Sequence, residues 1–374
     1  MSAEFGPRLR ALLTDRGMTL RGTARALNYN VAYISRVANG RQRPSVQLSQ
    51  ALDELLQAGG ELVRLSTPAA ALKWLDEPTG PASDIAHMKA CAEHILKHAD
   101  RYGGDAVAPV AVQVWQSAQR KLDAGEIPES AQRGYLAAVA EAAEVAGWLL
   151  FDSGDRVAAR NAFLESHMLA RHAGERAMEW FALDMLAMLD TECGRPGGVR
   201  RITDELLSQS RTPPRVALLA RVRRGRALAQ IGDRQRALAD LDAARGGVEE
   251  SLSSRDPEWA WWVNQQEIRG HSGHALLSLA DLNAAILKFQ SALAHATPRG
   301  VMLYRIELLH SYARAKAWRE AEEEIHEIAP LLSTITSGRN RLLLRDALQV
   351  VDQASGVPVG LSALVRDTAT AVTL

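Results

Sequence analysis

Apolar residues recur along this chain with the period of an α-helix. Four of them stand at i, i+4, i+7 and i+8, a spacing that lines one helix face: Phe5, Leu9, Leu12 and Leu13. From residue 84 to about residue 355 the same period continues, and no stretch alternates apolar and polar residues as a half-buried strand does. The pattern therefore predicts an all-α protein.

Two short helices joined by a tight turn are predicted after this first helix. Leu20, Ala24 and Leu27 share one apolar face. Asn28 stands where the turn favours a positive φ, which Asn tolerates. Asn30 is then a favourable N-cap for the second helix of the pair.

That second helix has a clear inner and outer side. Ile34, Val37 and Ala38 are expected to pack inward, and Asn39-Gly40 is expected to end the helix. The residues left to face outward are Val31, Ala32, Tyr33, Ser35 and Arg36. Two further apolar runs predict a fourth and a fifth helix: Leu48, Leu52, Leu55 and Leu56, then Leu62 and Leu65.

Two helices arranged in this way form a helix-turn-helix. The phrases ISR (34–36) and NGRQRPS (39–45) resemble the Cro/phage-repressor or XRE class, and the resemblance covers about residues 5–65. It implies a five-helix domain that binds double-stranded DNA, with the second helix of the motif in the major groove. The position at which that class usually carries Gly is Asn28 here.

Particular side chains are expected to contact DNA. Thr19, at the start of a helix, can hold a phosphate, whereas Val31 and Ala32 offer methyl contacts that suit thymine. Arg36 is the side chain best suited to reading guanine, and Tyr33, Arg41 and Arg43 are expected on the DNA backbone. The full predicted set is Thr19, Arg21, Asn30, Val31, Ala32, Tyr33, Ser35, Arg36, Asn39, Arg41 and Arg43.

Charge supports this division of the chain. The formal net charge of the 374 residues is zero, which argues against a protein that is basic throughout. Residues 1–65, however, hold nine arginines against five acidic residues, a net charge of +4, so the remainder carries −4. Only the N-terminal part has the electrostatic character of a DNA-binding domain.

Length and composition exclude several classes of protein. A chain of 374 residues suggests two or three domains, and 47% hydrophobic with 24% charged residues is typical of globular proteins. We see no run of 18 apolar residues and no leader segment, so we expect a cytoplasmic protein without membrane spans. Cys91 and Cys193 suit a reducing compartment, and we expect both to be small buried residues.

A change of composition marks a linker. Pro68, Pro78, Gly80 and Pro81 break helices, so we predict three parts: a DNA-binding domain at 1–65, a linker at 66–83 and a helical domain at 84–374. The linker includes Trp74, which could dock on either domain.

An internal repeat occupies the third part. Its unit consists of small residues at fixed spacing with one large apolar residue, as expected where two helices cross closely and the large residue fills the gap to the next unit. The best copies are Gly147-Gly154-Ala159-Phe163, Gly225-Gly232-Ala237-Leu241-Ala244 and Gly273-Ala280-Ala285-Phe289-Ala292. The repeat resembles the tetratricopeptide (TPR) repeat, although its spacing exceeds 34 residues. The resemblance implies an α-solenoid with a concave surface.

The whole chain resembles actinobacterial XRE-type regulators with a long C-terminal TPR domain. The shared phrases are HADRYGG (98–104), AGWLLFDSGDRVAAR (146–160) and LARHAGERA (169–177). Peptide-sensing regulators of the RRNPP type combine the same two modules, which is an analogy of architecture.

A concave ligand groove is therefore one hypothesis, and an ordinary solvated solenoid face is the alternative. Mixed charges and amides suit the binding of a peptide backbone. The positions that the repeat places on the concave side are Trp148, Asp152, Asp184, Met188, Glu192, Arg226, Gln230, Glu267, His274, His310 and Arg314.

Other features indicate no enzyme. Motifs for a nucleophile elbow, a phosphate loop or a zinc protease are absent from the sequence. His94 and His98 stand at i and i+4 without further ligand pattern, so we predict no catalytic residue, metal or cofactor. Within EWAWW (258–262), Trp259 and Trp262 share a face while Trp261 points elsewhere; core packing is one explanation, and a ligand or dimer contact is the other. The tail 358–374 could cap the last repeat or swap onto a partner.

The sequence thus favours a transcriptional regulator. We expect a homodimer, formed through the solenoid, that binds an inverted repeat. The solenoid would sense a signal peptide, a small molecule or a partner protein. The rival hypothesis is an interaction scaffold whose helix-turn-helix no longer reads DNA.

Overall fold

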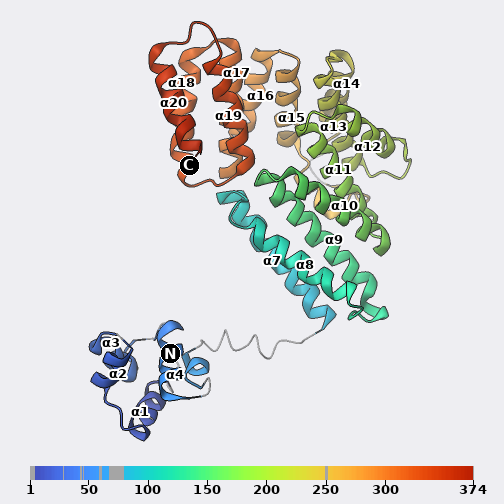
Figure 1. Cartoon of the computed structure of the whole chain (residues 1–374). Helices are drawn as coiled ribbons and strands as arrows, with labels where there is room; N and C mark the ends of the chain where they lie inside the picture. Colours follow the sequence, from blue (N-terminus) through green and yellow to red (C-terminus); the bar gives the residue numbers. More distant parts are fainter. Residues whose placement is uncertain are drawn as a thin grey trace. The chain divides into compact units, whose positions relative to one another are not determined.

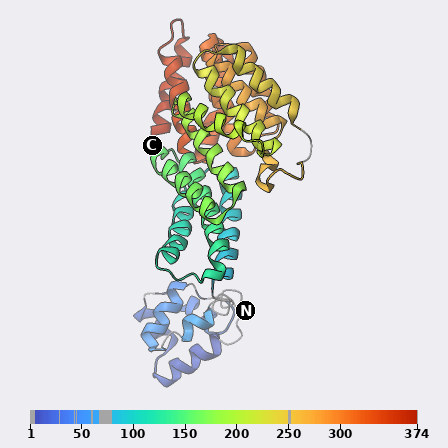
Figure 2. The ribbon, with the colours of Figure 1, turned by 90° about the vertical axis from the view of Figure 1, so that its right-hand side faces the viewer.

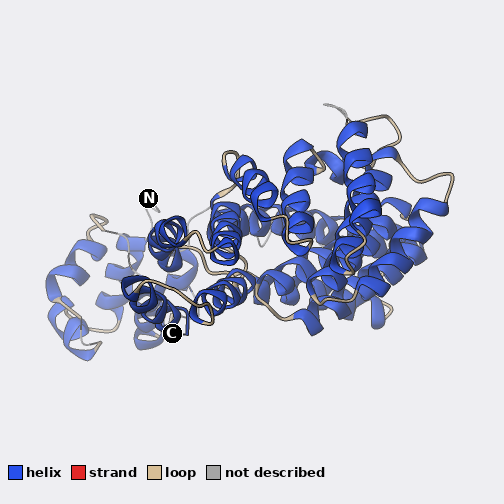
Figure 3. Cartoon of the chain, turned by 90° about the horizontal axis from the view of Figure 1, so that it is seen from above, coloured by secondary structure: helices blue, strands red, loops and turns tan. Residues whose placement is uncertain are grey.

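The regular structure of the chain is helical. The computed structural model describes residues 5–27, 29–42, 44, 46–58, 61–66, 80–248 and 252–373, and no strand occurs among them (Figure 3). The chain divides into two units, Met1–Ser83 and Asp84–Leu374 (Figure 1). The all-α fold predicted from the sequence is confirmed.

Five helices make up the described residues of the first unit up to Ser66, a part here called the head. They are α1 (Phe5–Asp15), α2 (Leu20–Ala26), α3 (Val31–Ala38), α4 (Val46–Leu56) and α5 (Glu61–Ser66). The predicted inward side chains form one core: Phe5, Leu9, Leu12, Leu13, Ala24, Ile34, Leu48, Leu52, Leu56 and Leu62 are all buried. Buried Asp53 of α4 stabilises the start of α5, because its carboxylate accepts a hydrogen bond from Leu62 N at 2.7 Å.

The second unit is longer and contains only helices and turns in its described residues. Its α-helices are α7 (Pro81–Tyr102), α8 (Ala108–Asp123), α9 (Glu129–Asp152), α10 (Arg156–Ala173), α11 (Arg176–Glu192), α12 (Pro196–Ser208), α13 (Pro214–Gln230), α14 (Arg234–Gly247), α15 (Gln265–Ser278), α16 (Leu282–Leu293), α17 (Pro298–Ala315), α18 (Trp318–Ile328), α19 (Gly338–Asp352) and α20 (Val359–Thr373). Two 3-10 helices, η2 (Glu258–Trp262) and η3 (Ala329–Ser333), interrupt the series.

From α9 onward these helices pack as antiparallel pairs. The pairs are α9 with α10, α11 with α12, α13 with α14, α15 with α16, α17 with α18, and α19 with α20. The first helices of successive pairs also contact one another, so α9, α11, α13, α15, α17 and α19 form an inner layer. Two views of the ribbon show the pairs following one another along the unit (Figures 1 and 2). This unit is a TPR-like α-solenoid.

The small residues of the repeat are explained by close helix crossing. A Cβ atom on Gly147 would lie 2.6 Å from the ring of Phe163, and one on Gly273 would lie 2.6 Å from the ring of Phe289. The large residue therefore packs on the glycine of its own pair, and it also joins the core of the next inner helix. The sequence predicted only the second of these contacts.

The two ends of the solenoid are hydrogen-bonded to each other. Residues 102–105 and 334–338, which we call the closure seam, lie side by side, beside the ends of α7 and α19 (Figure 1). Thr336 N donates to Tyr102 O at 2.7 Å, and Asp105 N donates to Thr336 O at 3.1 Å. Gly338 N donates to the Asp105 carboxylate at 2.8 Å, and α19 packs directly on α9. The inner layer is thus closed on itself.

A glycine makes this approach possible. Gly103 has φ +90°, and a Cβ atom there would lie 2.3 Å from the carbonyl oxygen of Thr336. Any other residue would be strained at this φ, and its Cβ atom would collide with the backbone of Thr336.

Several expectations need correction. Of the two roles expected for the tail, the structure supports capping: the tail forms α20, whose Leu361, Val365 and Val372 are buried, and α20 packs on α18 and α19. Cys91 and Cys193 are half-exposed instead of buried, because Cys91 faces His87 on α7 (Sγ to Nε2, 3.4 Å) and Cys193 stands at the end of α11. Helix α7 begins at Pro81, where a missing N–H is harmless. Trp74 lies outside the described residues.

The tryptophan run fastens one repeat to another. Trp259 stacks on Phe181 of α11 with ring centroids 4.5 Å apart, and its Nε1 donates to Ala177 O at 2.9 Å. Trp262 lies on the same side, whereas Trp261 is 71% exposed. The predicted division of the three rings, with Trp259 and Trp262 on one side and Trp261 elsewhere, is confirmed.

By length and composition alone, α9 is the one described helix that could cross a membrane. Its most apolar window is 67% buried within the solenoid, between α8, α10 and α11. It is thus a core helix of this fold.

Candidate functional site

Helix α3 is fixed in the head by its inner face and by its N-cap. Ile34, Val37 and Ala38 are at most 1% exposed. The Asn30 side chain accepts a hydrogen bond from Ala32 N at 2.8 Å, as predicted for an N-cap. The first turn of α3 therefore faces outward, with Val31 41% exposed.

Most of the predicted DNA-contacting residues share this exposed surface of α2 and α3. The exposed members are Thr19, Arg21, Asn30, Val31, Ala32, Arg36, Asn39 and Arg41. Thr19 caps α2, because its hydroxyl accepts from Gly22 N at 3.1 Å. Arg36 lies one turn after Ala32, and its Nε donates to the Gln42 side chain at 2.7 Å. Asn28 and Arg43 lie outside the described residues.

Other members of the predicted set have structural contacts. Tyr33 is half-buried and lies beside Tyr29, with ring centroids 6.1 Å apart, so its ring supports α3 instead of facing fully outward. Ser35 is also half-buried. Asn39 closes the end of α3 by donating to Ser35 O at 2.9 Å, and Gly40 follows with φ +69°.

The arginines of the head fall into two groups. Arg8 is paired with Glu61 at 2.8 Å, and Arg10 donates to Ala38 O at 2.8 Å, so both hold the domain together. Arg21, Arg36 and Arg41 are exposed around the helix-turn-helix. This second group supplies the positive charge that DNA phosphates attract.

Comparison with known families agrees with this geometry. Residues 4–65 match the family described as "Helix-turn-helix domain". The head is a helix-turn-helix domain. The match spans all five helices of the head and none of the solenoid.

Two wider comparisons add little. The chain matches none of the curated proteins with which it was compared. Among solved structures it is similar to one described as "Crystal structure of APC/C hetero-tetramer Cut9-Hcn1", with 13% identity, a TM-score of 0.36, and coverage of 90% of this chain and 68% of that chain. This similarity is too low to establish a fold, so the α-solenoid is identified from the packing of the helix pairs in this chain.

The residues predicted for a concave groove all lie on inner helices. Trp148 and Asp152 belong to α9; Asp184, Met188 and Glu192 to α11; Arg226 and Gln230 to α13; Glu267 and His274 to α15; His310 and Arg314 to α17. Only Gln230 and Arg314 are exposed. Even these are bonded to neighbouring repeats, Gln230 to Thr191 O at 2.9 Å and Arg314 to Leu277 O at 2.7 Å.

A buried ion pair lies at the centre of this interior. Arg223, 1% exposed, donates through Nε and Nη2 to both oxygens of Asp184, at 3.0 and 2.9 Å. Its Nη1 lies 2.9 Å from His271 Nε2, and Glu267 Oε1 lies 2.9 Å from the same nitrogen. Four groups from α11, α13 and α15 are thus joined.

Further ion pairs cross from the first half of the solenoid to the second. Glu192 of α11 accepts from Arg226 at 3.3 Å and from Arg339 of α19 at 3.1 Å. Asp152 of α9 accepts from Arg299 of α17 at 2.8 Å. The concave side is therefore bridged by its own side chains, and the expected open or solvated surface is wrong for these residues. Met188 lies in an apolar core instead.

Burial acts to raise the pKa of the interior acids Glu144, Glu307 and Glu267, which differ in whether nearby hydrogen bonds and cations reverse this effect. Glu144 has a pKa raised to about 8 by burial and by the charges of Glu141 and Asp184. Burial and the charge of Glu192 raise the pKa of Glu307 to about 7. Although burial opposes it, the hydrogen bond with His271 and nearby arginines lower the pKa of Glu267 to about 2.

The two histidines of α15, His271 and His274, are neutral at pH 7. Burial and the charge of Arg223 lower the pKa of His271 to about 4. Burial and the charge of Arg226 hold the pKa of His274 well below its usual value. The imidazoles therefore serve as neutral hydrogen-bonding groups in a network whose charges are carried by arginines and carboxylates.

Sequence reasoning missed half of this network. Arg223, His271 and Glu307 each lie three residues before a predicted groove residue, on the same helix face. That spacing could have placed them. Arg299 and Arg339 begin α17 and α19 and had no such signal, because their contacts depend on closure of the solenoid.

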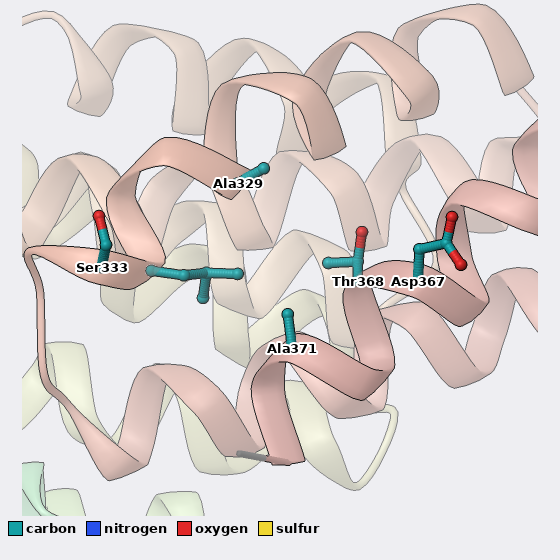
Figure 4. Close-up of a pocket in the computed structure, with 6 residues that line it drawn as sticks. Ala329, Ser333, Asp367, Thr368 and Ala371 are labelled. Atoms are coloured by element: carbon teal, nitrogen blue, oxygen red, sulfur yellow. The ribbon is translucent and has the colours of Figure 1, made fainter.

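A depression of about 470 Å³ lies elsewhere, between η3 and α20 (Figure 4). Its lining residues are Ala329, Leu332, Ser333, Asp367, Thr368 and Ala371. Wide open and lined mainly by small side chains, it has little to orient a ligand. Among the described residues, no three His, Cys, Asp or Glu side chains are grouped to hold a metal ion.

Proposed function

We propose that this chain is a cytoplasmic, sequence-specific transcriptional regulator of the XRE type, which binds DNA through α3. The observation that carries the proposal is the head itself. It matches a helix-turn-helix family, and its capped α3 leaves Val31, Ala32 and Arg36 exposed. In a helix-turn-helix, this first turn of the second helix enters the major groove.

Within this proposal the base-reading group is Arg36. A guanidinium can donate two hydrogen bonds to guanine O6 and N7. Thr19, Arg21 and Arg41 contact phosphates, which set the position of the head without reading sequence. Asn30 caps the start of α3, and Asn39 closes its end through a hydrogen bond to Ser35 O. Tyr33 packs beside Tyr29 and stabilises the helix in the head.

The proposed active form is a homodimer on an inverted repeat. One head of this size offers a single strong reading side chain, which is less than specific DNA affinity usually needs. Two heads related by two-fold symmetry would read half-sites about one helical turn apart, or a multiple of that.

The solenoid is proposed as the regulatory part of the protein. Its effector would be a signal peptide, a small molecule or a partner protein. The large helical surface supports a role in protein contacts. The filled interior means that an effector on the concave side has to replace ion pairs that already exist there.

The test is selection of bound fragments from random DNA by the purified full chain, followed by two variants. Arg36→Ala should weaken binding to the selected site by about 1–3 kcal/mol and relax preference at one base pair per half-site. Arg41→Ala should weaken all sequences equally and reduce the salt dependence. Failure to enrich any site would favour the scaffold hypothesis, and identical sequence profiles for both variants would defeat the assignment of Arg36.

A further inference from the structure

Helix α10 carries a line of exposed apolar side chains. Val157, Leu164 and Met168 are 74%, 46% and 46% exposed. They stand at i, i+7 and i+11, so they lie in one row along the helix, and exposed Asn161 completes the row at i+4. The opposite face of α10 is buried against α9 and α11.

No other outer helix has such a row among its described residues. Helix α16 exposes a single large apolar side chain, Leu287, at 67%. The exposed positions of α12, α14 and α18 are mostly charged or small: Arg201, Asp204 and Glu205; Arg234, Arg236 and Asp242; Arg319, Glu320 and Glu323. The row on α10 is therefore a local feature and no general property of the repeat.

The spacing of the row matches that of a helix-pairing seam. Residues 157, 161, 164 and 168 follow the alternating steps of four and three that place side chains between two packed helices.

The row is also complementary to itself when two copies run antiparallel about a two-fold axis. Val157 then lies opposite Met168 of the partner subunit, and Asn161 lies opposite Leu164 of the partner subunit. Exposed Arg171, one turn beyond Met168, places a polar side chain at each end of the seam. A surface that fits itself in this way gives a closed two-fold dimer.

We propose that this row on α10 is the surface through which two copies of the chain associate. The proposal rests on the proposed function, since a regulator that reads an inverted repeat must bring two heads together. It names the surface for that association and its occupant, a second α10.

The extent of the seam sets the strength of the dimer. Helix α10 has 18 residues and is about 27 Å long. One helix pair of this length covers less than the about 800 Å² that each partner buries in a stable interface. The free dimer is therefore weak, with a dissociation constant in the micromolar range. DNA completes assembly, because two heads bound to adjacent half-sites raise the effective concentration of one α10 near the other.

The experiment uses the full chain with two matched variants. Leu164→Glu places a charge in the middle of the seam, whereas Leu287→Glu makes the same change at another exposed leucine, on α16. Both sites are exposed, so folding should be preserved, and circular dichroism checks it. Sedimentation velocity from about 1 to 100 µM should show a monomer–dimer equilibrium whose dissociation constant rises at least tenfold in Leu164→Glu alone. On the selected DNA site, that variant should also lose cooperative binding of the second chain.

Register is tested by cross-linking. In the double variant Val157→Cys with Met168→Cys, a short bis-maleimide should join two chains. Either single variant should show only the background of the parent protein, because equal residues lie at opposite ends of an antiparallel seam.

The possible results separate the two proposals. If both glutamate variants dimerise like the parent, or if the parent stays monomeric at 100 µM and on DNA, the α10 seam is wrong. Sequence-specific DNA binding can still hold in either case. If no DNA site is selected while dimerisation depends on Leu164, the seam stands and the proposed function fails.

Discussion

Replacing one buried acid should stabilise the solenoid and change its response to pH. Glu144 of α9 is 5% exposed, and its pKa in the folded chain is about 8 against an ordinary 4.5. A group whose pKa is raised by folding contributes full stability below pH 4.5 and loses it as pH rises towards 8. Each pH unit in this window corresponds to about 1.4 kcal/mol.

The loss at pH 7 is then about 3 kcal/mol relative to the protonated state, and at pH 8 it is about 4 kcal/mol. Glu144→Gln keeps the size of the side chain and cannot ionise. We expect the variant to unfold with about 2–4 kcal/mol more free energy than the parent at pH 8, and with little difference at pH 4.5. Part of the pH dependence persists because Glu307 titrates in the same range.

The assay is urea unfolding followed by circular dichroism at pH 5, 6, 7, 8 and 9. Glu320→Gln, on the exposed surface of α18, serves as the control and should leave the free energy of unfolding unchanged. A parent protein whose stability is constant between pH 6 and 8, or a Glu144→Gln variant less stable than the parent at pH 8, would refute the assignment of a buried neutral carboxyl group.

Two further substitutions test the interior and its closure. Arg223→Met should cost about 3–5 kcal/mol of stability, because it leaves Asp184 buried and charged, and adding Asp184→Leu should restore most of that loss; equal losses in single and double variants would contradict the pairing. Gly103→Ala should open the closure seam and speed hydrogen exchange at residues 334–342, whereas Gly125→Ala, with a similar positive φ but nothing within 4 Å, should not; similar exchange in both variants would exclude the collision with Thr336.

The head could be predicted from sequence in considerable detail. Its core consists of leucines at helical spacing, and both ends of α3 have a local signal, Asn30 before the helix and Gly40 after it. Local hydrogen bonds and one small core determine this domain, so short-range patterns suffice. The DNA contacts remain predictions, since they depend on a partner molecule.

The solenoid was predictable repeat by repeat but not as a whole. The contact between Gly147 and Phe163 can be predicted from the repeat pattern, because both residues belong to one helix pair. The contact between Tyr102 and Thr336 has no such signal. It depends on the small rotation between successive pairs, which accumulates over the inner helices and cannot be read from any one repeat.

The same limit explains why charged residues were assigned to an open surface. An arginine on the inner face of a solenoid is expected to face water unless an acid faces it from another helix. Glu192 and Arg339 become partners only because closure brings α19 to α11. Consequently Arg226, which shares Glu192 with Arg339, is a structural residue, and its substitution by Ala would perturb the fold as well as any ligand contact.

Closure also constrains how the concave side could respond to an effector. An extended ligand there would have to separate Asp152 from Arg299 and Glu192 from Arg339, and these pairs join the first two inner helices to the last two. Since the ligand must supply equivalent partners to the freed charges, it has to carry both acidic and basic or amide groups; an apolar molecule would leave the charges buried and unpaired. Its apparent affinity is reduced by the small fraction of open solenoid, so any change that weakens the closure seam should tighten ligand binding on the concave side. A ligand bound on the outer helices would show no such dependence, which makes the seam a means of locating the effector site.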